Sequence, residues 1–188
     1  MVCLRLILQE LKYIRQYMID KKNKIIISAV TGSLLLLLYV LIFMFSAQNA
    51  EETGALSRRF SEKCVEIINH LSGHRWSDAL AKSFAEYFEH PVRKLAHFSE
   101  YAIMGILVYV LWAQWMAQGK KLYLLTIAWV FFSAMADEFH QLFVPGRYGS
   151  FVDVLLDTAG GAFGVLVCTW VTKIFWQSRR RKYATEYK

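Results

Sequence analysis

Long apolar runs separated by polar segments dominate the pattern of this chain. Four runs, at about 25–46, 95–115, 122–143 and 151–172, reach the roughly 20 mostly apolar residues that an α-helix needs to cross a bilayer. The first run contains no charged residue. It is longer than the roughly 7–15-residue core of a signal peptide, so we expect an uncleaved anchor. The pattern predicts an all-α fold, a polytopic membrane bundle of four transmembrane helices.

Residues 1–24 have an amphipathic pattern instead. Apolar residues recur there at helical spacing, with basic residues at other positions; the apolar residues are Leu4, Leu8, Leu11, Ile14 and Met18. This spacing predicts an N-terminal interfacial helix lying on the inner leaflet. A short solvated helix packed on the domain is the alternative.

The connection at 47–93 carries two further apolar stripes at helical spacing. The first consists of Leu56, Phe60, Cys64, Ile67, Ile68 and Leu71, and the second of Trp76, Leu80, Phe84 and Phe88. Ser77 is placed to cap the second helix, and we expect Pro91 to end it. The stripes predict two short extracytoplasmic amphipathic helices that cover the outer mouth of the bundle. We expect His70, His74 and His90 on them to be solvated, with a metal role as the alternative.

Charge and composition add the topology. The 188 residues leave room for one domain, and the net charge is +7. The basic residues flank the apolar runs, which favours membrane topology over nucleic-acid binding. Their positions predict a multi-pass protein of the cell membrane with both termini cytoplasmic. The expected parts are a cytoplasmic segment at 1–24, a membrane domain at 25–172 and a basic cytoplasmic tail at 173–188. The wide spacing of Cys3, Cys64 and Cys168 predicts neither a disulfide framework nor a cysteine metal site.

Polar residues gather near the outer ends of the predicted spans. By helical spacing, Lys94, His97 and Tyr101 share a face of the second span, and Asp137 and Gln141 share a face of the third. Each helical residue rises about 1.5 Å, which places Glu100, Glu138 and Asp157 at one level, roughly 7–9 Å inside the outer ends. A shallower level holds His97, Gln141 and Asp153, with a rim of Lys94, Arg147 and Gln48.

Such a layer is costly in lipid. An acid at the centre of a spanning helix costs about 2.5–3.5 kcal/mol, and less towards the interface. The side chains are therefore expected to point into the bundle, where they line a hydrated outer-leaflet pocket or pair with one another. A purely structural ion-pair network is the alternative. Within this region, Pro145 and Gly146 suit a tight turn that holds Arg147 over the pocket, where it clamps an anion or pairs with Asp153 or Asp137. Gly160 and Gly164 form a small-xxx-small pair that lets another helix approach closely.

The polar segments resemble the motifs of the VanZ-like family of membrane proteins. The resemblance rests on "FSAQ" at 45–48, "RKLAHFSEYAIMG" at 93–105, "DEFHQLFVPGR" at 137–147 and "DVLLDTAGGAFG" at 153–164. The matching positions are Ser46, Gln48, Lys94, His97, Glu100, Tyr101, Asp137, Glu138, Gln141, Arg147, Asp153, Asp157 and Gly161. The resemblance implies a cell-envelope protein that lowers susceptibility to a lipid-anchored glycopeptide such as teicoplanin.

Three functions are compatible with this sequence. The first is a protein that binds or remodels an anionic envelope component, such as a lipid headgroup, a lipid-linked precursor or a glycopeptide. Its candidate ligand-binding residues are Ser46, Gln48, Lys94, Tyr101, His140, Gln141, Arg147 and Asp153.

The second function is an intramembrane hydrolase or transferase that acts on a lipid-linked substrate. Its candidate catalytic residues are His97, Glu100, Asp137, Glu138 and Asp157. A divalent metal would suit this chemistry, although no known metal motif is present. The third function is a proton-coupled transporter, for which four spans are few unless the protein forms a homo-oligomer.

Overall fold

In the computed structural model, the described residues of the protein form five helices. The model describes the backbone of residues 2–73, 75–117 and 119–186 and the side chains of residues 20–49, 54–55, 57–73, 75–117 and 119–174. The helices are α1 (Val2–Ser46), α2 (Ala50–Leu71), α3 (Asp78–Ala113), α4 (Lys120–Gln141) and α5 (Phe151–Glu186). No strand occurs in these residues, so the predicted all-α fold is confirmed.

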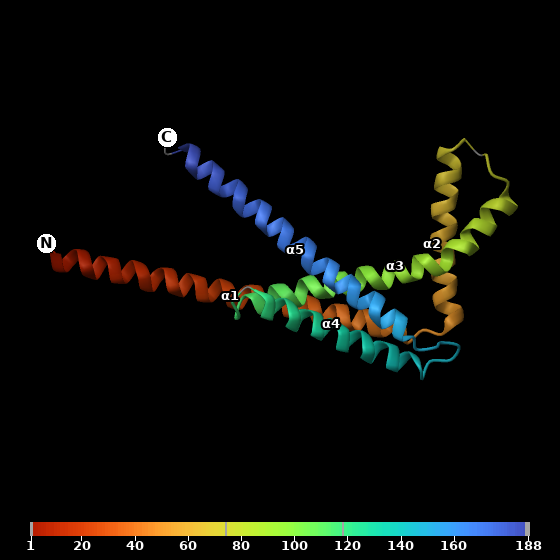
Figure 1. The fold of residues 1–188 in the computed structure, drawn as a ribbon, viewed down its shortest axis with the longest axis horizontal. Coiled ribbons are helices and arrows are strands. Elements are labelled where there is room, and N and C mark those ends of the chain that lie inside the picture. The colour runs from red at the N-terminus through yellow and green to blue at the C-terminus, as the bar shows by residue number, and fades with distance from the viewer. Residues whose placement is uncertain (1, 74, 118, 187–188) are drawn as a thin grey trace.

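Among the described residues, four helices are long and apolar enough to cross a membrane, as predicted. The candidate spans are Asp20–Ser46, Asp78–Ala113, Lys120–Gln141 and Phe151–Ile174. The two chain termini lie at one end of the bundle, and the α1–α2 and α4–α5 connections lie at the other (Figure 1). We call the second of these the turn end, defined by residues 47–49 and 142–150.

Helix α1 is one continuous helix from Val2 to Ser46. The predicted boundary between residues 24 and 25 therefore does not appear as a break in the backbone. Outside the described side chains lie the predicted N-terminal stripe, Cys3, Leu56, His74 and the tail residues Arg179, Arg180, Arg181, Lys182 and Lys188. The fourth run likewise continues beyond residue 172 as helix α5.

The prediction that Pro91 ends a helix is wrong. Pro91 lies inside α3, which continues from the connection into the second span without interruption. Proline lacks the N–H that would bond to the carbonyl of Tyr87, so the helix loses one backbone hydrogen bond there. The packing of α3 against α2, α1, α4 and α5 along its length holds it helical on both sides of that position.

Helix α3 is the centre of the bundle and packs most extensively on α5. Its Tyr101, Met104 and Val108 are buried against Leu38 and Ile42 of α1 and Val130 and Ala134 of α4. Small residues bring α3 and α5 together, because Gly160 faces the backbone of Phe98 and Gly164 faces the backbone of Ala102. The predicted close approach at these glycines is confirmed, and α3 is the partner.

Helix α2 and the first part of α3 form a helical hairpin at the turn end (Figure 1). The side-chain oxygen of Asn69 accepts from the backbone N–H of Trp76 at 3.0 Å, and its amide donates to the carbonyl of Trp76 at 3.1 Å. The Ser77 hydroxyl oxygen accepts from the N–H of Leu80, which confirms the predicted N-cap. These contacts close the connection between the two amphipathic helices.

Candidate functional site

The α4–α5 connection brings the ends of two spans together. The N–H of Arg147 donates to the carbonyl of Val144 at 3.1 Å, and Gly146 has a φ of 74°. Proline at the second position and a left-handed glycine at the third are typical of a type II β-turn, as the sequence predicts. Gly149 then lies so close to the carbonyl of Glu138 that a Cβ would sit 2.7 Å from that oxygen. The chain therefore returns directly onto α4.

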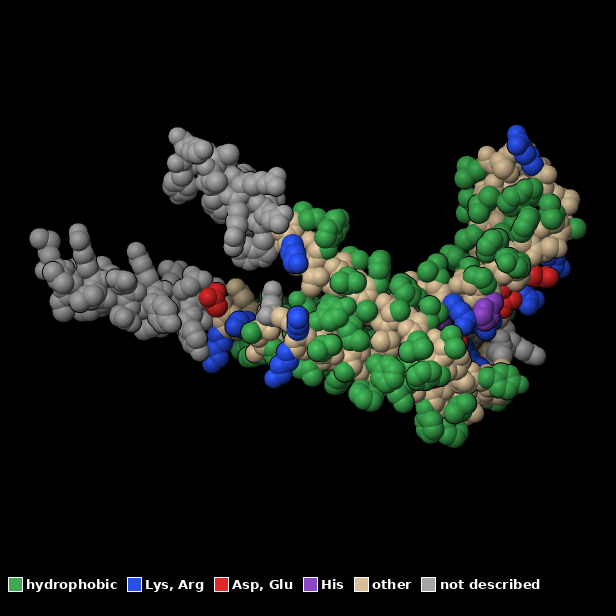
Figure 2. Space-filling view, in the orientation of Figure 1, with side chains coloured by type: hydrophobic (Ala, Val, Ile, Leu, Met, Phe, Trp, Pro, Cys, Tyr) green, Lys and Arg blue, Asp and Glu red, His purple; other side chains and the backbone are tan. Residues whose placement is uncertain are grey.

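A polar cavity of about 230 Å³ lies where α3, α4, α5 and this turn meet. Its lining consists of His90, Arg93, Lys94, His97, Glu138, Gln141, Gly146, Arg147, Tyr148, Asp153, Leu156 and Asp157. In Figure 2, Lys, Arg and His side chains gather at the base of the hairpin, where it joins the bundle. We call this space the polar cavity.

Several of its charged groups are already paired. Lys94 of α3 forms an ion pair with Asp153 in the first turn of α5. Glu138 of α4 accepts the backbone N–H of Ser150 at 2.7 Å. These two contacts link the three spanning helices across the cavity.

Other groups have no hydrogen-bond partner among the described residues. These atoms include Oδ1 of Asp157, Nδ1 of His97 and Oε2 of Glu100. Asp157 is only 1% exposed. His97 and Glu100 approach to 3.7 Å, which is too long for a hydrogen bond. Buried polar atoms are costly to leave unsatisfied, so these three mark places where a ligand or water is needed.

Arg147 joins the turn to α1. Its Nη2 donates to the carbonyl oxygen of Phe45 at 3.1 Å. Burial lowers the pKa of this guanidinium from its ordinary value, but arginine stays charged in proteins. A fixed positive charge therefore lies at the rim of the polar cavity.

An apolar cavity of about 510 Å³ adjoins the polar one. It is lined by Phe45, Gln48, Ser57, Phe60, Val92, Arg93, Leu95, Ala96, His97, Ser99, Glu100 and Arg147. Three residues, Arg93, His97 and Arg147, line both cavities. We call this second space the apolar cavity.

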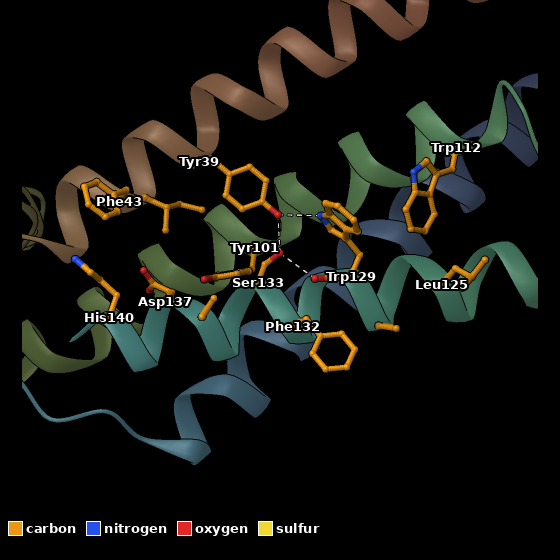
Figure 3. A pocket seen from close by; sticks show the side chains of 13 residues that line it. Tyr39, Phe43, Tyr101, Trp112, Leu125, Trp129, Phe132, Ser133, Asp137 and His140 are labelled. Atoms are coloured by element: carbon orange, nitrogen blue, oxygen red, sulfur yellow. Dashed lines mark hydrogen bonds between the residues drawn. The ribbon is translucent and has the colours of Figure 1, made fainter. Parts of the chain in front are cut away.

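A third space, the lateral groove, has a volume of about 700 Å³ and lies between α1, α3 and α4. Aromatic side chains line it, including Phe43, Trp112, Trp129 and Phe132 (Figure 3). Figure 3 also shows Asp137 and His140 at one end of the groove, with the Tyr101 hydroxyl pointing toward Asp137.

A hydrogen-bonded chain crosses the groove wall. Ser133 Oγ donates to the Trp129 carbonyl at 2.9 Å, so the Tyr39 hydroxyl donates to Ser133 Oγ at 2.6 Å. The Tyr39 oxygen in turn accepts from Nε1 of Trp129 at 2.9 Å. This chain ties α1 to α4.

The predicted site residues divide among these spaces. The polar cavity brings together Lys94, His97, Glu138, Gln141, Arg147, Asp153 and Asp157. Gln48 and Glu100 line the apolar cavity, whereas Tyr101, Asp137 and His140 line the lateral groove. Asp137 still connects to the polar cavity, because it accepts from Gln141 at 3.1 Å. Ser46 is fully buried at the end of α1.

Two basic residues of the polar cavity, Arg93 and His90, were not among the predicted site residues. Arg93 lines both cavities and pairs with Glu89 at 2.8 Å. It precedes His97 by four residues and therefore shares its helix face, a signal that the sequence contained. His90 shares that face too, but it precedes Pro91, where the helix was expected to end.

The described side chains do not meet the requirements of a metal site. No group of three or more His, Cys, Asp or Glu residues among them is arranged to hold a metal ion. Three of the acids have partners within the protein: Asp153 pairs with Lys94, Glu138 accepts the backbone N–H of Ser150, and Asp137 accepts from Gln141.

Comparison with known proteins identifies the family. Neither the curated proteins nor the solved structures contain a match to the chain. A family model described as VanZ/LLP1 matches residues 32–173. The matched segment begins within α1, extends through the fourth span and includes every residue that lines the polar cavity. The chain therefore belongs to the VanZ/LLP1 family.

Proposed function

We propose that this membrane protein binds an anionic amphiphile of the cell envelope at the turn end of its bundle. The headgroup lies in the polar cavity and the hydrocarbon chain lies in the apolar cavity. The observation that carries the proposal is that Arg93, His97 and Arg147 line both spaces. A ligand with one charged end and one apolar end satisfies both cavities at once.

The chemistry of the shared residues favours a phosphate or carboxylate headgroup. The planar guanidinium of arginine matches such groups with paired hydrogen bonds. The unpartnered Oδ1 of Asp157 and Nδ1 of His97 supply hydrogen bonds to headgroup hydroxyls or bound water. A cavity of about 230 Å³ has room for roughly eight waters, so it suits a small headgroup.

Equilibrium binding tests this proposal. The purified protein in nanodiscs is titrated with a fluorescent long-chain prenyl phosphate and with the uncharged alcohol of the same chain. We expect the phosphate to bind more tightly, and Arg147→Gln to weaken it roughly 10–100-fold, as loss of a charged hydrogen bond implies. Arg59→Gln on the exposed surface of α2 is the matched control. Equal affinity for the phosphate and the alcohol, with the protein folded, contradicts the proposal.

A second candidate function is hydrolysis or transfer at a lipid-linked phosphate. It is favoured by the buried, unpartnered atoms of His97 and Asp157 in one cavity, since general acid–base catalysis needs such groups. Incubation with lipid phosphates and pyrophosphates, followed by assay of released phosphate, tests it. Turnover that Asp157→Asn and His97→Gln abolish while ligand binding persists supports an enzyme. Binding without turnover rejects this candidate.

The turn end is proposed to face the cell exterior, with both termini in the cytoplasm. The basic residues in the first 24 positions of α1, in the first turn of α4 and near the end of α5 support this orientation. In a cysteine-free background, a single cysteine at the exposed Tyr148 should react with a membrane-impermeant thiol reagent in intact cells. A cysteine at Lys121 should react only after lysis.

A cellular consequence is proposed from the resemblance to VanZ-like proteins. Occupation of the polar cavity by an envelope component or by the antibiotic would lower susceptibility to teicoplanin. Disruption of the gene should then raise susceptibility, and the wild type but not Arg147→Gln should restore the original level. If teicoplanin susceptibility does not change after disruption of the gene, this protein has no role in resistance. That result would not bear on the binding proposal.

A further inference from the structure

The hairpin at the turn end has an apolar surface that the bundle does not cover. We call it the arm, formed by α2 and by residues 78–92 of α3. Its two helices bury one face against each other, with Ser57, Ser61 and Val65 on α2 and Ala85 on α3. This contact accounts for only part of the apolar surface of each helix.

A second stripe on each helix stays exposed. On α2, Phe60 and Ile67 are each 59% exposed and Leu71 is 81% exposed. On α3, the exposed stripe consists of Leu80, Phe84, Tyr87 and Phe88. The spacing of three and four residues places each set in one row along its helix. The exposed positions opposite these rows are charged, for example Glu66 on α2 and Lys82 on α3.

The two rows lie on the same side of the arm. Viewed along each helix from its N-terminus, the exposed row is rotated from the buried row by about a quarter turn. The direction of this rotation is the same in both helices. Helix α2 crosses the first part of α3 at a steep angle, and α3 runs back toward the bundle (Figure 1). Because the rotation has the same sense on both helices, the two rows face the same side of this crossing. Figure 2 shows hydrophobic side chains gathered on the arm. An exposed apolar face with charged residues on the opposite side is typical of helices that lie in a membrane interface.

The position of the arm identifies the membrane as its partner. Helix α3 passes from the arm into the apolar run at about 95–115 without a break, so the arm adjoins the part of α3 that the sequence predicts to cross the bilayer. The exposed row of α3 continues to Leu95, which lines the apolar cavity. Phe60 of α2 lines the same cavity. The apolar face is therefore continuous with both the lipid-facing surface of the bundle and the wall of the apolar cavity.

We propose that the arm lies in the interface of the leaflet at the turn end, with its apolar face in the hydrocarbon. In this position it forms one wall of a lateral entrance through which a lipid passes along Phe60 and Leu95 into the apolar cavity. The entrance rests on the proposed binding function, whereas the membrane contact of the arm does not. A lipid then reaches Arg93 and Arg147 without leaving the bilayer.

Depth measurement tests the membrane contact. Single cysteines at Ile67, Phe84 and Glu66, in a cysteine-free background, carry an environment-sensitive fluorophore in reconstituted vesicles. We expect blue-shifted emission and quenching by brominated lipids at Ile67 and Phe84, and quenching by aqueous iodide at Glu66. Glu66 is the matched control because it neighbours Ile67 and lies on the charged face. Equal iodide quenching at all three positions overturns the proposal.

Association kinetics test the entrance. The double substitution Ile67→Gln and Leu71→Gln is expected to shift the Phe84 probe toward water and to slow uptake of a fluorescent prenyl phosphate from vesicles roughly tenfold. Affinity in detergent should stay unchanged, because neither residue lines the polar cavity or the apolar cavity. If the Phe84 probe moves toward water but the rate of prenyl phosphate uptake stays the same, the proposed entrance is wrong. Absence of lipid binding by the wild type contradicts the binding function, while the depth measurement still decides the membrane contact.

Discussion

Gly164 of α5 lies directly against the backbone of Ala102 in α3, and a Cβ at Gly164 would sit 2.0 Å from the carbonyl oxygen of Ala102. The same contact repeats one turn earlier, where a Cβ at Gly160 would sit 2.4 Å from the carbonyl of Phe98. The two helices that carry most of the polar cavity therefore touch through their backbones. Their separation therefore sets the distance between Asp157 of α5 and His97 of α3, which line the same cavity.

Replacement of Gly164 by alanine should destabilise the protein. The added methyl group has no space, so α3 and α5 must separate, at a cost of about 1–3 kcal/mol in the free energy of unfolding. Unfolding by denaturing detergent, followed by circular dichroism, measures this loss. Gly32→Ala is the control, because nothing lies within 4 Å of a Cβ there. It should leave stability unchanged or raise it by up to about 1 kcal/mol through helix propensity. Equal effects of the two substitutions would contradict the packing explanation.

Glu138 is expected to stabilise the α4–α5 connection by accepting a hydrogen bond, and its negative charge is not needed for this. Its carboxylate accepts the N–H of Ser150, and Glu138→Gln retains an oxygen that can do the same. Glu138→Leu leaves that N–H without an acceptor and should cost about 1–3 kcal/mol of stability. Hydrogen exchange at the Ser150 amide distinguishes the two variants. Fast exchange in both would show that the charge itself is required.

The ion pair between Lys94 and Asp153 should contribute modestly to stability. Each side chain is about one-third exposed, at 35% and 30%, so water screens the attraction. A double-mutant cycle with Lys94→Met and Asp153→Asn should give a coupling energy of about 0.2–1 kcal/mol. Purely additive effects would mean that the two groups act independently on stability.

Tyr39→Phe should loosen α1 from α4. The substitution removes a donor to Ser133 and the acceptor of the Trp129 indole N–H, and we expect a loss of about 1 kcal/mol. The emission of Trp129 should also change, because its indole loses a hydrogen bond. Tyr123→Phe is the matched control, since no hydrogen bond of the Tyr123 hydroxyl occurs among the described residues. If both variants change stability and Trp129 emission equally, the hydrogen bonds of Tyr39 do not hold α1 to α4.

Much of the architecture could be predicted from hydrophobic pattern alone. Lipid-facing positions such as Leu36, Phe132 and Leu166 are exposed on the protein and must be apolar in a bilayer, which is why the spans are visible in the sequence. Local rules also identified the turn at Pro145 and Gly146 and the cap at Ser77. These features depend on a few neighbouring residues.

Features that depend on packing between helices could not be predicted. The spacing of Gly160 and Gly164 indicates a close approach but does not name α3 as the partner. Helix-face reasoning places Asp137 beside Gln141, but it does not reveal that Gln141 lines the polar cavity while Asp137 lines the lateral groove. The division into three spaces depends on how side chains from different helices fill the bundle. Pro91 was expected to end a helix because proline disfavours the helix interior. The packing of the surrounding helices overrides that preference.

Pro91 also separates two mechanical parts of α3. Without an N–H at this residue, the Tyr87 carbonyl has no intrahelical partner, so bending there breaks no further hydrogen bond. The bend point falls one turn before Leu95, where the arm joins the span. The tilt of the arm can thus follow changes in bilayer thickness or curvature while the glycine-packed pair of spans stays rigid. On the proposed placement of the arm, this bending would couple the opening of the apolar cavity toward lipid to the physical state of the membrane.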